Sequence, residues 1–245
     1  MLISNTYPFT NAPDIETSST AYDLRFVGPI GQWFIQVQKD ALLKVIRAGD
    51  NRTVLDVGGG HAQTAIPLVE EGYDVTVLGS SAECSRKLNT LIEQHKCKFQ
   101  VGQVLKLPFP DKSFDTVIAF RLISHIENWQ LLISELCRVA KNNVIIDFPQ
   151  KFSFNALMPV LFGTKRRIEK NTRFFLVFEK SEIRKEFIKN GFLCAETIPQ
   201  YFFPMVLHRF MKNPKISAVL EKVARSLKLH KVLGSPIVGG YNRVR

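Results

Sequence analysis

Apolar residues recur along this chain at two different spacings, and these spacings predict alternating strands and helices. Two longer stretches, 33–48 and 129–140, place apolar residues three or four positions apart, which is typical of amphipathic helices packed on a sheet. Five short apolar runs have the length of buried strands: 53–57, 74–78, 98–101, 116–120 and 144–148. Strands that alternate with helices at this interval predict a parallel, doubly wound sheet with right-handed crossovers.

The pattern changes after Pro149, where aromatic and basic residues mix without a clear period. Beyond residue 180 we predict a helix, a strand, two helices with Pro214 at a helix start, and a last strand, at 181–190, 192–198, 200–232 and 236–241. We therefore expect one domain in three parts: an N-terminal lead and helices (1–50), a core (51–150) and a basic C-terminal part (151–245). Residues 1–20 are polar and are predicted to form a flexible lead.

The stretch TVLDVGGGHA, residues 53–62, predicts a strand, a glycine turn and the start of a helix. Such a turn brings backbone N–H groups and a helix N-terminus close to a ligand, because glycine has no Cβ to block the approach. The dinucleotide fingerprint G-x-G-x-x-G fails, since its last position is Gln63. The alternative is acid-x-G-x-G, with Asp56, Gly58 and Gly60, and an acid there suits a ligand that carries an ammonium group. A purely structural turn of another α/β protein remains an open alternative.

Charge is unevenly distributed along the chain, whose formal net charge is +11. Residues 1–150 carry 14 Lys and Arg against 16 Asp and Glu, whereas residues 151–245 carry 19 against 6. The basic part predicts an anionic partner, such as a membrane surface, a phosphorylated substrate or nucleic acid, with a solvated basic surface as the equal alternative. No signal peptide or membrane span is predicted, and the four scattered cysteines indicate free thiols rather than a zinc site. We therefore expect a cytoplasmic protein, with a position peripheral to a membrane as an open alternative.

A second motif, LPFPDKSFDTVIAF at residues 107–120, follows the glycine turn further along the chain. Together the two motifs resemble the class I S-adenosylmethionine-dependent methyltransferases, and the second is similar to the ubiquinone and menaquinone methyltransferases. The resemblance runs from about Val54 to Pro149, and Ala62 departs from the third glycine of the family's turn. It implies a Rossmann-like, seven-stranded sheet, mostly parallel with an antiparallel last strand, with helices on both faces and a helical insert near the C-terminus.

The same resemblance implies which residues would bind S-adenosylmethionine. Asp56, Gly58, Gly59 and Gly60 would hold its methionine end. Where the family places an acid for the ribose hydroxyls, at the end of the second strand, this chain has Gly79. Ser80 or Glu83 could compensate, although S-x-x-E at 80–83 is also a helix capping box, which we favour.

Further cofactor contacts are implied at the ends of the third and fourth strands. Gln103 would accept from the adenine amine, and Val104 would offer its N–H and an apolar wall. Phe120 or Arg121 would lie beside the methionine moiety. At the N-terminus, Tyr22 and Arg25 are expected to close over the site and pair with the cofactor carboxylate, with a packing role as the alternative.

His125 follows the fourth strand and is the candidate general base, because imidazole titrates near neutral pH and this region faces the transferred methyl in the family. A surface or capping histidine is the alternative. The sequence thus predicts in-line methyl transfer to a small apolar or anionic acceptor, without a metal, with the stretches 152–163 and 201–210 helping to choose the acceptor. Two other functions stay open: an inactive cofactor-binding or interaction protein of the same fold, and an RNA-directed methyltransferase, although no nucleic-acid-binding signature is found.

Overall fold

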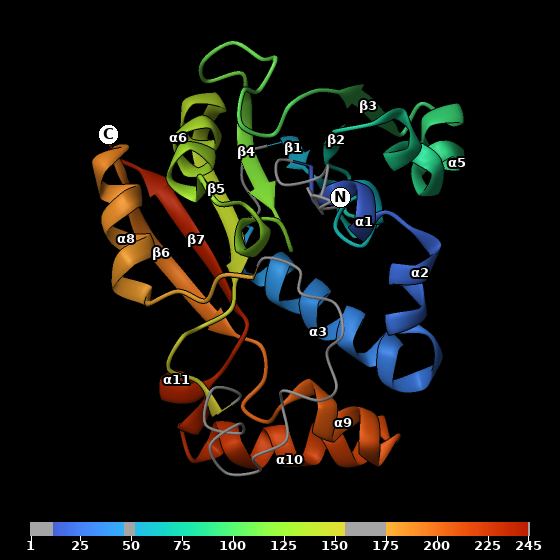
Figure 1. Ribbon diagram of the computed structural model, residues 1–245, viewed down its shortest axis with the longest axis vertical. Helices are drawn as coiled ribbons and strands as arrows, with labels where there is room; N and C mark the ends of the chain where they lie inside the picture. Colours follow the sequence, from blue (N-terminus) through green and yellow to red (C-terminus); the bar gives the residue numbers. More distant parts are fainter. Residues whose placement is uncertain (1–11, 47–51, 155–174, 245) are drawn as a thin grey trace, which may run out of the picture.

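The computed structural model describes residues 12–46, 52–154 and 175–244. Within them seven strands form one sheet in the order β3-β2-β1-β4-β5-β7-β6 (Figure 1). Their bounds are β1 Thr53–Val57, β2 Asp74–Gly79, β3 Cys97–Val101, β4 Phe114–Ala119, β5 Ala140–Phe148, β6 Phe192–Pro199 and β7 Ile237–Arg243. The pairs from β3 to β5 are parallel, while β7 runs antiparallel to both β5 and β6. The expected fold, with its antiparallel last strand, is confirmed.

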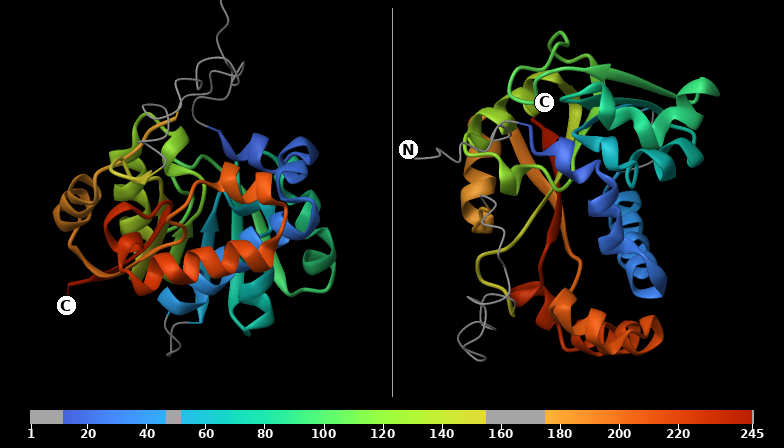
Figure 2. Two further views of the ribbon diagram at one scale, coloured as in Figure 1. Left: turned by 90° about the horizontal axis from the view of Figure 1, so that it is seen from below. Right: turned by 45° about the vertical axis from the view of Figure 1, so that its right-hand side comes forward.

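Helices cover both faces of the sheet (Figures 1 and 2). The α-helices are α1 Asp14–Thr17, α2 Thr20–Asp23, α3 Gly28–Val45, α4 Ala65–Glu70, α5 Asn89–Glu93, α6 Trp129–Val139, α8 Lys180–Lys189, α9 Met205–Met211, α10 Pro214–Ser226 and α11 Leu229–Leu233. Short 3₁₀ helices connect other elements: η1 Leu24–Phe26, η2 Gly59–His61, η3 Ala82–Leu88 and η4 Ile123–His125.

The sheet is buried on both faces because successive side chains of each strand point to opposite sides. Leu55 of β1 joins a cluster beneath α6 and α8, whereas its neighbour Val54 joins a cluster beneath α3 and α4. A third cluster links the N-terminal helices to the segment after β6 and contains Tyr22, Phe34 and Tyr201. The continuous apolar strands of the sequence therefore supply both layers of the core.

Several predicted elements differ from the observed ones in their ends or in their type. The expected lead is helical in its described part, where α1 and α2 form, and α3 begins at Gly28 because Pro29 stands in its first turn. The crossover expected to be one helix up to residue 95 is η3 followed by α5. Residues 200–232 hold three helices rather than two, and Pro214 does start one of them, α10.

Candidate functional site

The candidate site lies at the carboxyl ends of β1, β2 and β4. β1 pairs with β2 on one side and with β4 on the other, so the chain crosses in opposite directions from this point of the sheet. In open α/β sheets, ligands bind in the crevice outside such a reversal. The glycine turn follows β1 at this place, so the topology puts the sequence motif where a ligand site is expected.

The backbone of the glycine turn takes a shape that side chains would prevent. Gly58 has a φ of 75°, a left-handed conformation that favours glycine, and its N–H donates to the Leu78 carbonyl (2.8 Å). A Cβ at Gly59 would lie 2.1 Å from Oδ2 of Asp56. The turn therefore depends on glycine at both positions, and it closes over the carboxylate that ends β1.

Asp56 lies beneath this turn and is fully buried. The Thr64 hydroxyl, at the start of α4, donates to its Oδ2 (2.5 Å), while Oδ1 is buried without a partner among the described residues. Burial raises the pKa of Asp56 from 3.8 to about 7, and the Thr64 hydrogen bond opposes that rise. In this structure Asp56 thus fastens the turn to α4.

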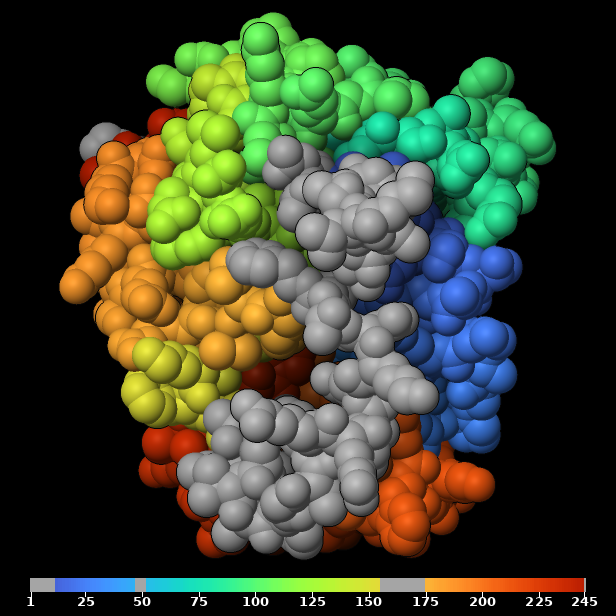
Figure 3. All heavy atoms as spheres, viewed as in Figure 1, coloured from blue at the N-terminus to red at the C-terminus, as the bar shows by residue number. Residues whose placement is uncertain are grey.

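The N-terminal helix α1 packs directly against the crevice above the turn. Asp14 is fully buried, and its carboxylate accepts hydrogen bonds from the Ser80 N–H (2.7 Å) and the Ser80 hydroxyl (2.6 Å). The Cβ of Asp14 lies 3.4 Å from where a Cβ at Gly58 would stand. Figure 3 shows the N-terminal helices (blue) against the segment that follows β2 (teal). An acid from the chain's N-terminal part therefore lies at the end of β2.

The cradle of the glycine turn is filled at its other end by Ser18. A Cβ at Gly60 would come 2.3 Å from Ser18 Oγ and 2.6 Å from the Cys84 carbonyl oxygen. The Ser18 hydroxyl donates to the Asp14 carbonyl (2.7 Å), which ties the two covering residues together. The turn itself has the side-chain-free shape that an adenosyl cofactor requires, but α1 and Ser18 lie in it, so the residues fit that cofactor only if this segment moves.

At the end of β2 the structure explains why position 79 carries no side chain. A Cβ at Gly79 would lie 2.7 Å from the Cβ of Cys84 and 2.9 Å from the ring of Phe99. The capping-box interpretation, in which its neighbour Ser80 caps the next helix, is wrong. Instead Ser81 is the N-cap of η3 and accepts from the Glu83 N–H, while Ser80 binds Asp14.

Gln103 and Val104 lie just beyond β3, as the sequence implied. Gln103 is exposed and forms an isolated bridge with Lys106, whereas Val104 is fully buried in the cluster beneath α6. Val104 therefore contributes an apolar floor near the end of β3, and the Gln103 side chain lies on the surface beside it.

Arg121 follows β4 and is the centre of a polar network. Its Nε and Nη2 donate to Oε1 of Gln38 on α3 (3.0 and 2.7 Å), and Nη1 donates to the Tyr22 hydroxyl (3.4 Å). The Arg121 backbone is left-handed (φ 57°), and its N–H donates to Oδ1 of Asp147 on β5 (2.5 Å). Left-handed backbone in a residue other than glycine costs free energy, and such positions cluster at functional sites.

Aromatic rings hold Arg121 and a second arginine near this network. The Arg121 guanidinium lies 4.2 Å from the ring centre of Phe26, and that of Arg25 lies 4.9 Å from the ring centre of Tyr22. The structure thus brings Tyr22, Arg25 and Arg121 together, and the closing role of Tyr22 and Arg25 stays a prediction. Phe120 is buried in the cluster beneath α3 and α4.

Asp147 and His61 are buried titratable groups of this region that the sequence analysis did not single out. Burial raises the pKa of Asp147 to about 6, while the N–H and the positive charge of Arg121 act to lower it. Burial lowers the pKa of His61 to about 3, helped by the positive charges of Arg121 and Lys87. His61 is therefore neutral, although a hydrogen bond with the Phe120 backbone opposes the lowering of its pKa.

His125, the candidate general base, ends the short helix η4 after β4. Its ring is half-buried and lies 5.4 Å, centre to centre, from the ring of Phe175. The Leu176 N–H donates to the Ser124 carbonyl, so the segment after residue 174 packs on η4. Its catalytic role stays a prediction.

Asp14, Ser18, Gln38, His61 and Asp147 are the residues of this region that sequence reasoning missed. Asp147 had a local signal, since it is the one acid in the apolar run VIIDF at 144–148. Asp14 had none, because the groups that its carboxylate contacts, in Ser80 and Cys84, lie 66 and 70 positions away. The apolar stretch 152–163 lies almost wholly outside the described residues.

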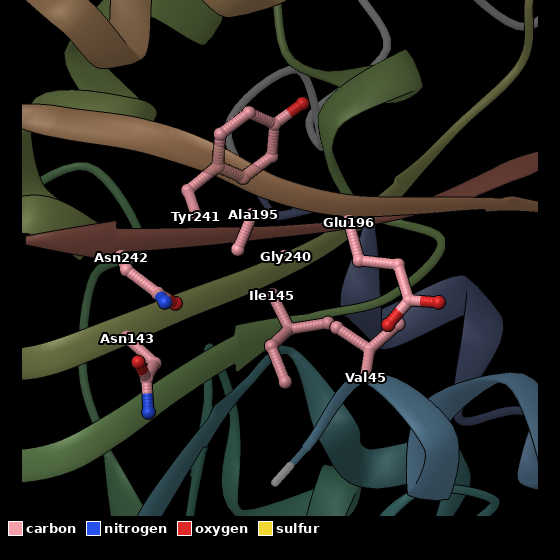
Figure 4. Close-up of a pocket in the computed structure, with 8 residues that line it drawn as sticks. All are labelled: Val45, Asn143, Ile145, Ala195, Glu196, Gly240, Tyr241 and Asn242. Atoms are coloured by element: carbon pink, nitrogen blue, oxygen red, sulfur yellow. The ribbon is translucent and has the colours of Figure 1, made fainter.

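A separate hollow of about 170 Å³ lies away from this site, between the end of α3 and strands β5, β6 and β7 (Figure 4). Asn143, Asn242 and Glu196 line it, while the Tyr241 ring leaves the sheet on the other side and stacks on Phe187. In residues 12–46, 52–154 and 175–244, no group of three His, Cys, Asp or Glu side chains is arranged to hold a metal ion. None of the helices in the same ranges is long and apolar enough to cross a bilayer.

Comparison with known proteins agrees with this geometry. A family described as "Methyltransferase domain" matches residues 55–146. The matched stretch begins in β1 and ends in β5, so it includes the glycine turn. An uncharacterised methyltransferase of Schizosaccharomyces pombe is 32% identical over 111 residues, which cover 41% of this chain and 39% of that protein. A demethylmenaquinone methyltransferase of Deinococcus radiodurans is 30% identical over 121 residues, covering 45% of this chain and 50% of its own.

Solved methyltransferases share the fold of this domain across nearly the whole chain. A magnesium protoporphyrin IX methyltransferase from Synechocystis with bound SAH has a TM-score of 0.65 at 19% identity, covering 93% of this chain and 96% of its own. A Thermotoga maritima SAM-dependent methyltransferase, described as a possible histamine N-methyltransferase, has a TM-score of 0.64 at 14% identity, covering 94% and 99%. The curated relatives, in contrast, match over no more than about half of their own length.

Proposed function

We propose that this protein is an S-adenosylmethionine-dependent methyltransferase that acts on a small molecule. The observation that carries the proposal is the glycine turn after β1, at the reversal point of a sheet with the order 3-2-1-4-5-7-6. The bound cofactor supplies the hard chemistry, an electrophilic methyl on a sulfonium. The protein's part is to bind, to orient the acceptor and to exclude water.

The cofactor would be held by the backbone of Gly58, Gly59 and Gly60, with Val104 as an apolar wall. The N–H and hydroxyl of Ser80 already bind an oxygen ligand, the carboxylate of Asp14, and they become available when α1 moves. Cofactor binding and the observed position of α1 are therefore alternatives. Displacement of α1 costs the hydrogen bonds of Asp14, which lowers the apparent affinity for the cofactor.

The acceptor is proposed to combine an apolar body with an anionic group. Arg25, Arg121 and Arg209 gather at the edge of the aromatic cluster of α2 and α3, and Arg209 donates to the Arg25 carbonyl (3.3 Å). Burial is the largest cause that lowers the pKa of Arg209, and the positive charges of Arg25 and Arg121 lower it further, because like charges repel. An anion bound among them would relieve that repulsion.

We propose that this acceptor resembles those of the ubiquinone and menaquinone branch of the family. The motif at 107–120 and the Deinococcus radiodurans relative support it. His125 is the proposed general base, since it lies just after β4, near the end of the sheet where the acceptor would bind. The basic C-terminal part supports an anionic membrane surface or a phosphorylated substrate as a further partner.

A binding protein without activity is the second candidate, and the filled crevice favours it. Calorimetric titration with S-adenosylhomocysteine and S-adenosylmethionine separates the two, followed by methyl transfer to demethylated quinone precursors. We expect one equivalent of either ligand to bind. Absence of binding of both would end the methyltransferase proposal, whereas binding without transfer would favour the second candidate.

The substitution Gly58→Ala tests whether the ligand binds in the crevice, and Gly72→Ala is its control. Both glycines have positive φ (75° and 83°), so both substitutions carry a similar backbone strain. A Cβ at Gly72 meets nothing within 4 Å, whereas one at Gly58 projects toward Leu122 and Asp14. We expect Gly58→Ala to weaken ligand binding at least about tenfold and Gly72→Ala to leave it unchanged.

A further inference from the structure

The helices α9, α10 and α11 form one end of the molecule, remote from β3 and α5 (Figure 2). This end exposes large apolar side chains, and Phe210 is 85% exposed. Six of them belong to α9, to α10 or to the residue that follows α10: Val206, Phe210, Ile216, Val219, Val223 and Leu227. We call this the α9–α11 surface, since Leu229 and Val232 of α11 extend it. A run of exposed apolar residues of this kind marks an interaction site more often than a neutral surface.

The orientation of α10 is fixed by one buried acid, so its apolar side is held outward. Glu221 accepts hydrogen bonds from the N–H groups of Phe202 (2.8 Å) and Phe203 (2.9 Å). It also lies 3.0 Å from Nε2 of the fully buried His208. Ser217 and Ala224 are buried on the same side of the helix. The helix therefore turns its polar and small residues inward and its aliphatic residues to solvent, the reverse of an ordinary surface helix.

Positive charge surrounds the exposed apolar side chains. Residues 205–233 contain seven Lys and Arg and a single acid, Glu221, which is buried. Two copies of the chain that met through this surface would bring like charges together. A nucleic acid would use the cations but would leave the aliphatic side chains unburied. Aliphatic residues interleaved with lysines match the boundary between anionic headgroups and acyl chains.

We propose that the α9–α11 surface docks on an anionic lipid bilayer, with Phe210 and the aliphatic residues of α10 inserted at the headgroup boundary. The lysines that flank them bind the headgroup phosphates and carboxylates. This docking does not rest on methyl transfer, and it would stand if the protein proved inactive. It would bring an apolar acceptor dissolved in the bilayer close to Arg25 of η1 and Arg209 of α9.

Co-sedimentation of the full chain with lipid vesicles tests the proposal. Vesicles of phosphatidylcholine with about 30% phosphatidylserine are compared with vesicles of phosphatidylcholine alone. Each lysine or arginine near an anionic surface changes the partition coefficient about fivefold at moderate salt. We therefore expect at least about a hundredfold preference for the anionic vesicles, and most of that preference should disappear in 0.5 M salt.

Two pairs of variants separate the apolar from the electrostatic contribution. Phe210→Ser with Val223→Ser should lower the partition coefficient about tenfold. Its control, Leu131→Ser with Ile188→Ser, changes residues of α6 and α8 that are 48% and 50% exposed outside the surface. Lys215→Glu with Lys222→Glu should lower binding at least about twentyfold. Lys96→Glu with Lys106→Glu makes the same change of net charge at exposed positions elsewhere.

The proposal is supported if both test pairs weaken vesicle binding and both controls keep it, with unchanged circular dichroism and unfolding temperature in all four. Equal binding to neutral and anionic vesicles overturns it, and so do controls that lose as much as the test pairs. Light scattering supplies a third outcome. A dimer that Phe210→Ser dissociates would assign the surface to a second copy and would also overturn the proposal.

Discussion

Two regions of this molecule place polar and apolar groups in opposite ways. Around the glycine turn, the carboxylates of Asp14, Asp56 and Asp147 are buried. At the α9–α11 surface, aliphatic and aromatic side chains are exposed. Both arrangements depart from the usual one, and each departure is informative because it costs free energy unless something compensates it.

The difference lies in what compensates each cost. The buried acids find donors within the chain: the Ser80 N–H for Asp14, the Thr64 hydroxyl for Asp56 and the Arg121 N–H for Asp147. For the apolar side chains of the α9–α11 surface, the compensating partner must come from outside the chain. The first region is therefore closed in this structure, and we propose that it opens when a ligand binds, whereas the second region is exposed as it stands.

Glu221→Leu tests whether the buried Glu221 holds α10 with its apolar side chains outward, and we expect the largest effect here. The substitution leaves the N–H groups of Phe202 and Phe203 and the Nε2 of His208 without their acceptor. Loss of one partner from such a buried set costs about 3–5 kcal/mol of unfolding free energy. Urea denaturation measures the change. Lys222→Leu, at the next and exposed position of α10, should change it by less than about 0.5 kcal/mol, and equal stability of the two variants would show that Glu221 does not fix this helix.

Local patterns predicted the sheet and the glycine turn because each depends on residues that are close in sequence. The five strands up to residue 148 and the turn at 58–60 were found where expected. Periodicity also predicted a helix after Pro214, yet it could not say which side faces inward. The groups that decide the question, the N–H of Phe202 and Phe203, lie 19 and 18 positions before Glu221.

Non-local contacts account for what the sequence did not predict at the site. Two adjacent serines, Ser80 and Ser81, could each cap the following helix, and only the bond between Ser80 and Asp14 decides in favour of Ser81. The helix α1 has four residues, too few for a periodic signal, and it forms because Asp14 and Ser18 pack on the turn. The filled crevice could therefore be seen only in three dimensions.

The buried acid beneath the turn predicts a pH dependence of stability. The pKa of Asp56 is raised from 3.8 to about 7 in the folded protein, so the folded state holds this proton to a higher pH than the unfolded chain does. The stabilisation is present in full below about pH 4 and is lost as the pH rises through 7. Relative to Asp56→Asn, the unfolding free energy of the natural protein should fall by about 2 kcal/mol between pH 5 and pH 8.

A second variant at the same place sharpens this measurement. Thr64→Val keeps the carboxylate but removes the hydroxyl that stabilises its ionised form. The loss of stability should then have its midpoint at a higher pH than in the natural protein. A flat difference between the natural protein and Asp56→Asn across this range would mean that Asp56 is ionised under the turn, and that the closed region is less closed than the structure indicates.

The smallest expected effect tests whether the closed region opens at α1. Asp14→Ala removes the acceptor that holds Ser80, so α1 should compete less well with an adenosyl ligand. Titration with S-adenosylhomocysteine should give about tenfold tighter binding, which corresponds to about 1.4 kcal/mol and is the size expected for hydrogen bonds to a charged acceptor. Glu16→Ala, at an exposed position of the same helix, is the control and should change the affinity little.

Weaker binding by Asp14→Ala would reverse the interpretation of α1. Asp14 would then contact the ligand itself and would supply from the N-terminus the acid that Gly79 lacks. The sign of the change in affinity therefore shows whether Asp14 competes with the ligand or contacts it. An unchanged affinity would show that α1 does not affect ligand binding in the crevice. Tighter binding remains our expectation, because the groups that Asp14 occupies in the closed structure are those that a ligand at the end of β2 would need.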